Sequence, residues 1–252
     1  MVSIFSRSSQ QSHDREITVS LILGIETSGV SGSIALQTGE KRIDARTLSQ
    51  GGRRHAQSLL KEIDELFRKH SLKPRDCTAV AVSQGPGSFT GLRVGIVCAK
   101  TWAYATNGQL AAVDTFLAVA ENSPADVNKV FVVENAQRGD LFVGRYRRNV
   151  NGHFERTGEI EIVPAQSWIA ELNAKATVSG PGLDKYREQI SDKCRTLDAA
   201  SCQPSASQIV KLGAKQLAEG KATDFWEVEP FYLRKSAAEE KWEARQAEQL
   251  SD

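Results

Sequence analysis

Two patterns of apolar residues alternate along the chain, and they predict strands and helices in turn. Short runs rich in β-branched residues are typical of buried strands, and the first half has such runs at 18–25, 33–37, 41–47, 79–82 and 109–113. Apolar residues three or four positions apart predict two amphipathic helices, at 53–70 and 90–106. Asp114 then offers an N-cap for a further helix.

The second half repeats this order of elements. Its apolar runs predict strands at 129–134, 141–147, 154–163 and 176–179, and helices are expected after Pro164, from about 183 and from about 205. Each half therefore has the order β-β-β-α-β-α, with a Gly-Pro-Gly turn after its fourth strand. Such a duplication predicts an α/β fold of two lobes with mixed sheets, at 17–113 and 114–235.

The two ends of the chain lack this pattern. Residues 1–16 are polar and have no apolar core, so they are predicted to form a disordered N-terminal extension. Residues 236–252 favour a helix but have little apolar face, which predicts a charged, solvated C-terminal tail.

Composition and charge narrow the classes of function. A net charge of +1 over 252 residues argues against strong stand-alone binding of nucleic acid, because such binding normally needs a basic excess. The four cysteines stand at irregular spacings without a CxxC pair, which favours free thiols in a reducing compartment. The longest apolar runs are too short to span a bilayer. We therefore expect a cytoplasmic protein without a membrane segment.

The glycine-rich stretch SQGPGSFTGLRVG at 83–95 is the first candidate for chemistry. It fits neither the GxxxxGK[ST] phosphate loop nor the GxGxxG dinucleotide fingerprint, because both would need glycine where Thr90 stands. Two interpretations remain. Ser88 or Thr90 caps a helix whose free N–H groups attract an anion or a partner's carboxylate, or the glycines let this helix pack tightly on the sheet.

The second candidate is the hairpin LGIETSGVSGSIAL at 23–36. Glu26 at the strand end could assist a cation, while the hydroxyls of Thr27 and Ser28 could donate to phosphate oxygens. The alternative is an ordinary hairpin with turn-forming Ser and Gly. A weak nucleotide site can be assembled from the two stretches, and it comprises Glu26, Thr27, Ser28, Gly85, Gly87 and Ser88.

Two lobes with an acid-and-hydroxyl hairpin resemble the actin, sugar-kinase and Hsp70 (ASKHA) superfamily, which has ribonuclease H-like lobes. Within it the stretches GIETSGVSGSIAL, RRHAQSLL, QGPGSFTGLRVGI and VEPFYLR, in this order, resemble the TsaB (YeaZ) family over about residues 18–235. GPGSFTGLR is the most diagnostic of the four. Members of that family belong to the bacterial machinery that makes threonylcarbamoyladenosine in tRNA.

The resemblance implies an accessory subunit rather than an enzyme. It would dimerise with the TsaD-type catalytic subunit, recruit a TsaE-type ATPase, meet tRNA only through the complex, and form a homodimer when alone. No cofactor would be required, although ADP or ATP at a subunit interface is compatible with it. The expected partner interface lies on the helices 53–70 and 90–106 and comprises Arg53, Arg54, His55, Ser88, Phe89, Thr90, Arg93, Val97, Lys100 and Tyr104. Arg93 would hold an acidic group of a partner or a nucleotide.

Several features argue against catalysis by this chain alone. TsaD holds a metal through an HxxxH helix motif, but here Gly51 and Leu59 stand four residues from His55, so no metal site is expected. Ser88 lies outside a GxSxG elbow, so protease activity is not expected. The family's Asp-Ala-Arg pattern is replaced at Asn135 and Gln137. The alternative is a self-sufficient nucleotide-dependent ASKHA enzyme, an ATPase or transferase, that uses the hairpin and the glycine loop.

Overall fold

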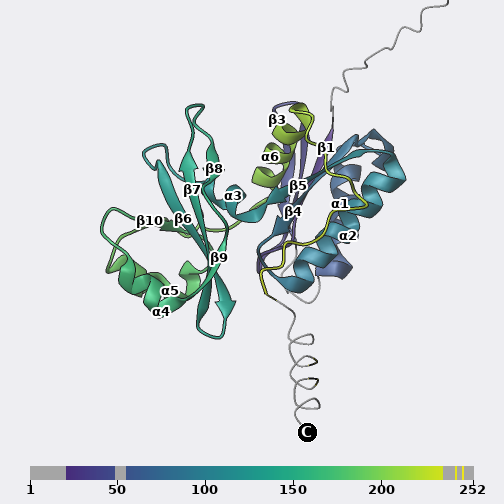
Figure 1. Ribbon diagram of the computed structural model, residues 1–252. Coiled ribbons are helices and arrows are strands. Elements are labelled where there is room, and N and C mark those ends of the chain that lie inside the picture. The colour runs from purple at the N-terminus through teal and green to yellow at the C-terminus, as the bar shows by residue number, and fades with distance from the viewer. Residues whose placement is uncertain (1–20, 49–54, 235–241, 243–245, 247–252) are drawn as a thin grey trace, which may run out of the picture.

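The computed structural model describes residues 21–48 and 55–234, together with 242 and 246, and these form two α/β lobes (Figure 1). The first lobe is built on a five-stranded sheet with the order β3-β2-β1-β4-β5. Its strands are β1 (Ile22–Glu26), β2 (Ser33–Thr38), β3 (Lys41–Thr47), β4 (Ala79–Gly85) and β5 (Gln109–Asp114). The meander β1–β3 is antiparallel, whereas β4 and β5 run parallel to β1.

Helices cover both faces of this first sheet. Figure 1 shows α1 (His55–Lys69) and α2 (Phe89–Thr106) on one face and α6 (Ala206–Ala218) on the other. Alternate residues of each strand point to opposite faces, so Leu23 packs with α1 and α2 while Ile22 packs with α6. A Cβ at Gly24 would lie 2.7 Å from the Ala206 carbonyl oxygen, so glycine lets α6 pack directly on β1.

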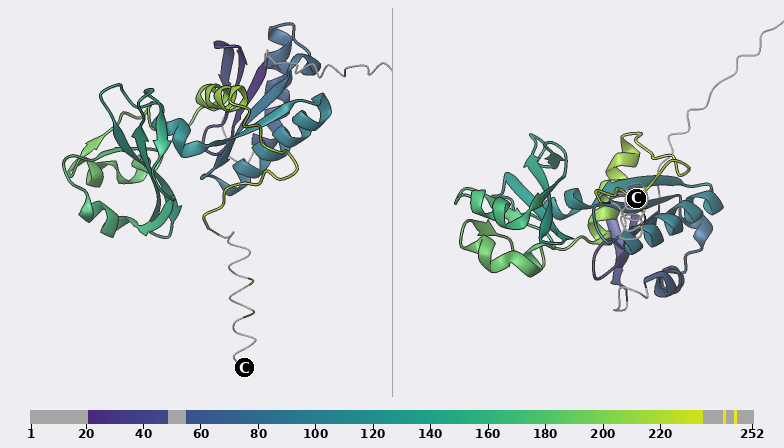
Figure 2. Two further views of the ribbon diagram at one scale, coloured as in Figure 1. Left: turned by 45° about the horizontal axis from the view of Figure 1, so that its top comes forward. Right: turned by 60° about the horizontal axis from the view of Figure 1, so that its bottom comes forward.

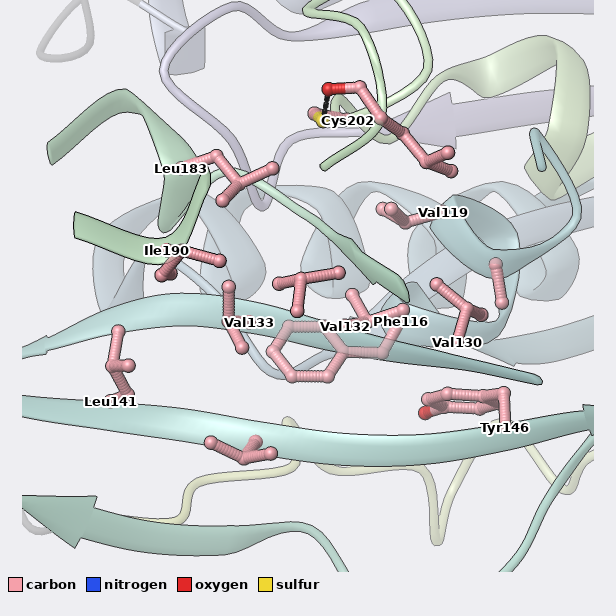
Figure 3. Packing of buried hydrophobic residues seen from close by; sticks show 14 of the residues in the cluster. Phe116, Val119, Val130, Val132, Val133, Leu141, Tyr146, Leu183, Ile190 and Cys202 are labelled. Carbon is pink, nitrogen blue, oxygen red and sulfur yellow. Dashed lines mark hydrogen bonds between the residues drawn. The ribbon is translucent and has the colours of Figure 1, made fainter. Parts of the chain in front are cut away.

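The second lobe is built on a six-stranded sheet with the order β11-β10-β6-β7-β8, in which β9 also pairs with β7. Its strands are β6 (Lys129–Gln137), β7 (Asp140–Arg148), β8 (Phe154–Arg156), β9 (Glu161–Pro164), β10 (Thr177–Ser179) and β11 (Arg195–Thr196). Its helices are α3 (Thr115–Ala120), α4 (Ala165–Glu171) and α5 (Leu183–Ser191). Side chains from β6, β7, α3 and α5 form one apolar core, which is seen from close by in Figure 3.

The two lobes meet at Asp114. This residue ends β5 and caps α3 through its Oδ1 atom, which accepts hydrogen bonds from the N–H groups of Phe116 and Leu117, as the sequence predicts. Its Oδ2 accepts a hydrogen bond of 2.9 Å from the hydroxyl of Tyr146, on β7. Burial raises the pKa of Asp114, even though these hydrogen bonds lower it. The connection between the lobes is therefore a hydrogen-bonded joint.

The boundary predicted between the lobes needs a correction. The range 114–235 assigns the last helix to the second lobe, but α6 packs on β1, β2, β4 and β5 of the first sheet. The small residues Ala81 and Gly213 meet at this contact, and their size makes it close. After α6 the chain stays on the first lobe, where the backbone N–H of Thr223 donates to the Leu110 carbonyl, as the yellow segment in Figure 2 shows.

Smaller differences concern strand limits. The predicted strand 154–163 is two strands, β8 and β9, because Gly158 between them has a φ of +123°, which breaks an extended run. The short strand β11 and the 3₁₀ helix η1 (Pro74–Asp76) have no apolar periodicity and escape prediction. Residues 1–16 and nearly all of 236–252 lie outside the described residues. In the part of the chain that the structure describes, every helix is too short or too polar to cross a membrane.

Candidate functional site

A cleft of about 780 Å³ lies between the two lobes. One wall comes from the first lobe, where the hairpin after β1 and the start of α2 lie together. The opposite wall comes from the β6–β7 turn and from Pro181, and residues 231–234 close one side. The lining comprises Ser28, Gly29, Val30, Pro86, Gly87, Ser88, Phe89, Thr90, Glu134, Asn135, Ala136, Gln137, Arg138, Phe142, Pro181, Phe231, Tyr232, Leu233 and Arg234.

The hairpin and the glycine loop, which are 60 residues apart in the sequence, are bonded to each other. The Thr27 hydroxyl donates to the Gly91 carbonyl at 2.8 Å, and the backbone N–H of Ser88 donates to the Ser28 carbonyl at 2.7 Å. A Cβ at Gly91 would lie 1.9 Å from the Thr27 carbonyl oxygen, and one at Gly95 would lie 2.3 Å from the Thr27 hydroxyl oxygen. Two glycines of the loop therefore serve close packing of α2 against the hairpin, which is one of the two interpretations of the sequence.

Glu26 occupies the centre of the hairpin, fully buried. Its Oε1 accepts hydrogen bonds from the backbone N–H and the hydroxyl of Ser28, both at 2.5 Å, and from the N–H of Gly29 at 3.3 Å. Its Oε2 is buried and has no hydrogen-bond partner among the described residues. Burial raises the pKa of Glu26, although the hydrogen bonds from Ser28 oppose this shift.

These contacts bear on the predicted nucleotide site. Of the residues predicted for this site, Ser28, Gly87 and Ser88 line the cleft, whereas Glu26, Thr27 and Gly85 are buried and do not line it. Their donors are largely engaged within the protein, because Glu26 takes the N–H and hydroxyl of Ser28 and Gly91 takes the hydroxyl of Thr27. The N–H of Gly85 likewise donates to the Thr115 hydroxyl at 3.0 Å. A phosphate here would have to displace existing hydrogen bonds.

Glu134 is the titratable residue of the cleft that the sequence interpretation overlooked. It stands on β6 directly opposite Phe142 of β7, and both line the cleft. Burial raises the pKa of Glu134 to about 7, and the negative charges of Asp184 and Glu26 add to the shift. An acidic residue after the apolar run Val130–Val133 was the available signal, since strands buried on one face rarely place a carboxylate there without a reason.

The C-terminal segment Phe231–Arg234 spans the cleft from lobe to lobe. On the first lobe the N–H of Phe231 donates to the Gln84 carbonyl at 2.8 Å, and the ring of Tyr232 stacks on Phe89 with centroids 4.4 Å apart. On the second lobe Arg234 donates to the Ala136 carbonyl at 2.7 Å and forms an ion pair with Asp140. The segment YLR, quoted above for its family resemblance, is thus a bridge between the lobes.

The residues that replace the Asp-Ala-Arg pattern shape the β6–β7 turn. The Asn135 side-chain oxygen accepts a hydrogen bond of 3.1 Å from the backbone N–H of Gln137. Gln137 and Arg138 then both have positive φ, +66° and +54°. Asn135 therefore has a structural role in the turn, because its side chain stabilises a backbone conformation that few residues adopt.

The second candidate surface is the outer face of α1 and α2. Leu60, Val97 and Tyr104 are exposed here by 63%, 62% and 67%, although all are large and apolar or aromatic. Beside them lies a groove of about 580 Å³. It is lined by Leu59, Leu60, Pro74, Arg93, Val94, Val97, Cys98, Thr101, Trp102, Ala105 and Thr106. A surface with so much exposed apolar area is typical of a protein–protein contact.

The predicted interface residues divide between these two surfaces. Ser88, Phe89 and Thr90 line the cleft, whereas Arg93 and Val97 line the groove. Arg93 donates to the Tyr232 hydroxyl at 3.0 Å and lies 4.1 Å over the Phe89 ring, so it already has partners within the chain.

Lys100 also has internal partners, because its ammonium donates to the Trp226 and Val228 carbonyls. Trp102, for which core and interface both remained open, packs at 5.2 Å on Phe67 and also lines the groove. Arg53 and Arg54 lie outside the described residues, and only the backbone of His55 is described, at the start of α1.

Among the described residues, no three His, Cys, Asp or Glu side chains gather into a group that could hold a metal ion. His70 lies 3.1 Å from Asp44 and His153 lies 3.5 Å from Glu121, and both pairs are partly buried.

Comparison with known proteins shows which family the chain belongs to. Residues 47–242 match the family model described as TsaD, tRNA N6-adenosine threonylcarbamoyltransferase. The tRNA threonylcarbamoyladenosine biosynthesis protein TsaB of Bacillus subtilis (strain 168) is 28% identical, over 88% of this chain and 97% of its own. TsaB of Escherichia coli (strain K12) is 27% identical, over 86% of this chain and 96% of its own.

A solved structure agrees with the sequence matches. YeaZ from Pseudomonas aeruginosa superposes with a TM-score of 0.72 at 25% identity, covering 85% of this chain and 100% of that one. The match extends over both lobes and confirms the two-lobed ASKHA-like fold. With the GIETS hairpin, the GPGSFTGLR loop and the YLR bridge arranged around one cleft, the chain belongs to the family that the TsaD model describes and, within it, to the TsaB (YeaZ) group.

Proposed function

We propose that the protein is a non-catalytic, organising subunit of the complex that transfers threonylcarbamoyl to the adenosine next to the anticodon of ANN-decoding tRNAs. The curated relatives that match nearly end to end are named as TsaB proteins of threonylcarbamoyladenosine biosynthesis, which supports this pathway. tRNA would be met only through the complex, in keeping with the net charge of +1.

The observation that carries the organising role is the exposed apolar face of α1 and α2. Leu60, Val97 and Tyr104 present side chains that a monomer would normally bury, next to a groove of about 580 Å³. We assign this face to the TsaD-type subunit. In the isolated protein the same face would pair with a second copy, giving a homodimer. A TsaE-type ATPase would then join the heterodimer, with ADP or ATP held at a subunit interface rather than as a cofactor of this chain.

The hairpin supports a role without catalysis. In a nucleotide-dependent enzyme its hydroxyl and N–H groups would donate to phosphate oxygens. Here the buried Glu26 accepts those of Ser28, and Gly91 accepts the hydroxyl of Thr27. The polar groups of the hairpin thus hold the glycine loop and α2 in place, and through them the docking face.

Reconstitution with purified components tests the proposal. Threonylcarbamoyladenosine formation on tRNA from threonylcarbamoyl-AMP is measured with this protein alone, with a TsaD-type subunit alone, and with both together. We expect product only when the TsaD-type subunit is present and a large increase when this protein is added. Product from this protein alone would instead support the alternative, a self-sufficient ATPase or transferase that uses the hairpin and the glycine loop.

Glu26→Ala separates the two functions further. If the hairpin were catalytic, this variant would abolish activity in the reconstituted complex even when the variant is folded and co-elutes with its partner. For an organising subunit, activity follows the amount of complex formed, so a Glu26→Ala protein that co-elutes normally retains activity.

A further inference from the structure

The carboxylate of Glu134 has no hydrogen bond or ion pair to another described residue, although it is half-buried in the wall of the cleft. The other acids near the cleft are engaged differently: Glu26 accepts three hydrogen bonds inside the hairpin, and Asp140 is paired with Arg234. An unpaired carboxylate in such a place destabilises the fold, because burial disfavours its charge. The cleft therefore holds a carboxylate with which no described residue forms an ion pair.

Aromatic rings line the same cleft as this group. Phe142 is its direct cross-strand neighbour, Phe231 lines the side closed by the C-terminal segment, and the stacked pair of Phe89 and Tyr232 lines the first-lobe wall. Aromatic faces together with a carboxylate attract organic cations, because the ring quadrupole and the negative charge act in the same direction. The Phe89 ring already makes a contact of this kind within the chain, because the Arg93 guanidinium, which lines the groove, lies 4.1 Å over it.

We propose that the cleft between the lobes binds a small organic cation, a primary ammonium or guanidinium on an apolar or aromatic body, with Glu134 as its counter-ion. At about 780 Å³ the cleft is large enough for a ligand of this kind. The site is independent of the docking face on α1 and α2, so the inference does not rest on the proposed function.

The charges around the cleft agree with this ligand class. Asp184, at the start of α5, and Glu26 act on Glu134 with the same sign, so they add to the attraction for a cation. Of the basic residues that line the cleft, Arg234 is neutralised by Asp140, and Arg138 stands on the exposed β6–β7 turn. A polyphosphate would meet the carboxylate of Glu134, whereas an ammonium group would form a charge-assisted hydrogen bond with it.

Ligand-observed and ¹⁵N-detected NMR titrations of the full chain test this proposal with phenethylamine as the probe. Phenylpropionate, phenylethanol and ADP serve as the anionic, neutral and nucleotide comparisons. We expect a dissociation constant of about 10 mM or lower for phenethylamine. Its affinity should be at least about tenfold higher than that of phenylpropionate or phenylethanol. Shifted amides should include those of residues 134–138 and 142, which line the cleft.

Two variants locate the interaction. Glu134→Gln should weaken phenethylamine binding by about tenfold or more, whereas Glu159→Gln, which removes an exposed carboxylate of the same lobe, should leave it unchanged. Binding should also strengthen between about pH 6 and pH 8, because Glu134 loses its proton there while the amine keeps its own.

Three results would overturn the proposal. They are equal affinity for phenethylamine and phenylethanol, unchanged phenethylamine binding in a Glu134→Gln protein with wild-type thermal stability, and no phenethylamine binding. ADP binding that Glu134→Gln leaves intact would assign the cleft to nucleotides instead. None of these results depends on whether the TsaD-type subunit binds to α1 and α2.

Discussion

The Thr27 carbonyl oxygen lies so close to Gly91 that a Cβ at that glycine would be only 1.9 Å away. This contact joins the strand end of the first hairpin to the first turn of α2, and the hydrogen bond from the Thr27 hydroxyl to the Gly91 carbonyl fixes it. Glycine is needed at position 91 because the backbones of the hairpin and of α2 approach each other closely there. Such a contact cannot be relieved by rotating a side chain, because the nearest atom belongs to the main chain.

Gly91→Ala should therefore destabilise the fold strongly. An added methyl group forces the hairpin and α2 apart, and overpacking of this kind costs about 3 kcal/mol. Urea unfolding followed by circular dichroism measures the loss, with Thr101→Ala on the exposed side of the same helix as the control, for which less than about 0.5 kcal/mol is expected. Equal stability of the two variants would mean that the loop and hairpin are farther apart than the structure places them.

Local pattern was enough to predict most of the fold. The run Ile22–Glu26 is buried along its length, and the caps Ser88 and Asp114 each accept hydrogen bonds from the helices that they precede. What the pattern could not predict is where α6 packs. An amphipathic helix packs on an apolar surface, and both sheets offer one. Which sheet α6 covers depends on the small residues Gly24 and Ala81, which let the helix approach the first sheet closely.

The candidate site was predicted only in part for a similar reason. The hairpin and glycine loop stand out through residue types that are rare in strands and helices, and the structure brings them together. Nothing in the local sequence marks Glu134, or the bridge from Arg234 to Asp140, as part of a site. Their roles arise only because the two lobes bring these residues to the same cleft. That arrangement follows from the joint at Asp114, which no local motif describes.

Glu134 should make the stability of the protein depend on pH. Its pKa is about 7 in the folded chain and lower when unfolded, so between these values the folded state binds more protons and stability falls as pH rises. Glu134→Gln removes the cost of ionising this carboxyl group in the folded state. We therefore expect the variant to be about 2 kcal/mol more stable than the parent at pH 8, and nearly equal to it in stability at pH 5. Urea titrations at both pH values measure it, and a variant that is less stable at pH 8 would contradict the prediction.

The bridge across the cleft should control the β6–β7 turn. Arg234→Ala removes the hydrogen bond to the Ala136 carbonyl and the ion pair with Asp140, whose side chains are only 24% and 26% exposed. We expect amide hydrogen exchange at residues 136–140 to become about tenfold faster, because this turn loses two contacts with the segment that is bonded to the first lobe.

Arg145→Ala is the matched control for the bridge. Arg145 also pairs with a carboxylate from the second lobe, that of Glu161, but this pair is 42% and 45% exposed and lies within one sheet. Exchange at 136–140 should stay unchanged in this variant. Equal effects of the two substitutions would show that the turn is held by the second lobe alone.

Val97→Glu should disrupt the docking face without unfolding the protein. Val97 is 62% exposed on α2 beside the groove, so a charge there stays in water in the monomer but would be buried against a partner or a second copy. We expect co-elution with the TsaD-type subunit to be lost, through a fall in affinity of about thirtyfold or more, while the free energy of unfolding changes by less than about 0.5 kcal/mol. Val150→Glu is the control, because Val150 is fully exposed and follows β7 of the second lobe. If Val97→Glu and Val150→Glu both co-elute as the parent does, the partner docks elsewhere, since a buried, unpaired carboxylate at the centre of a contact cannot be neutral in energy.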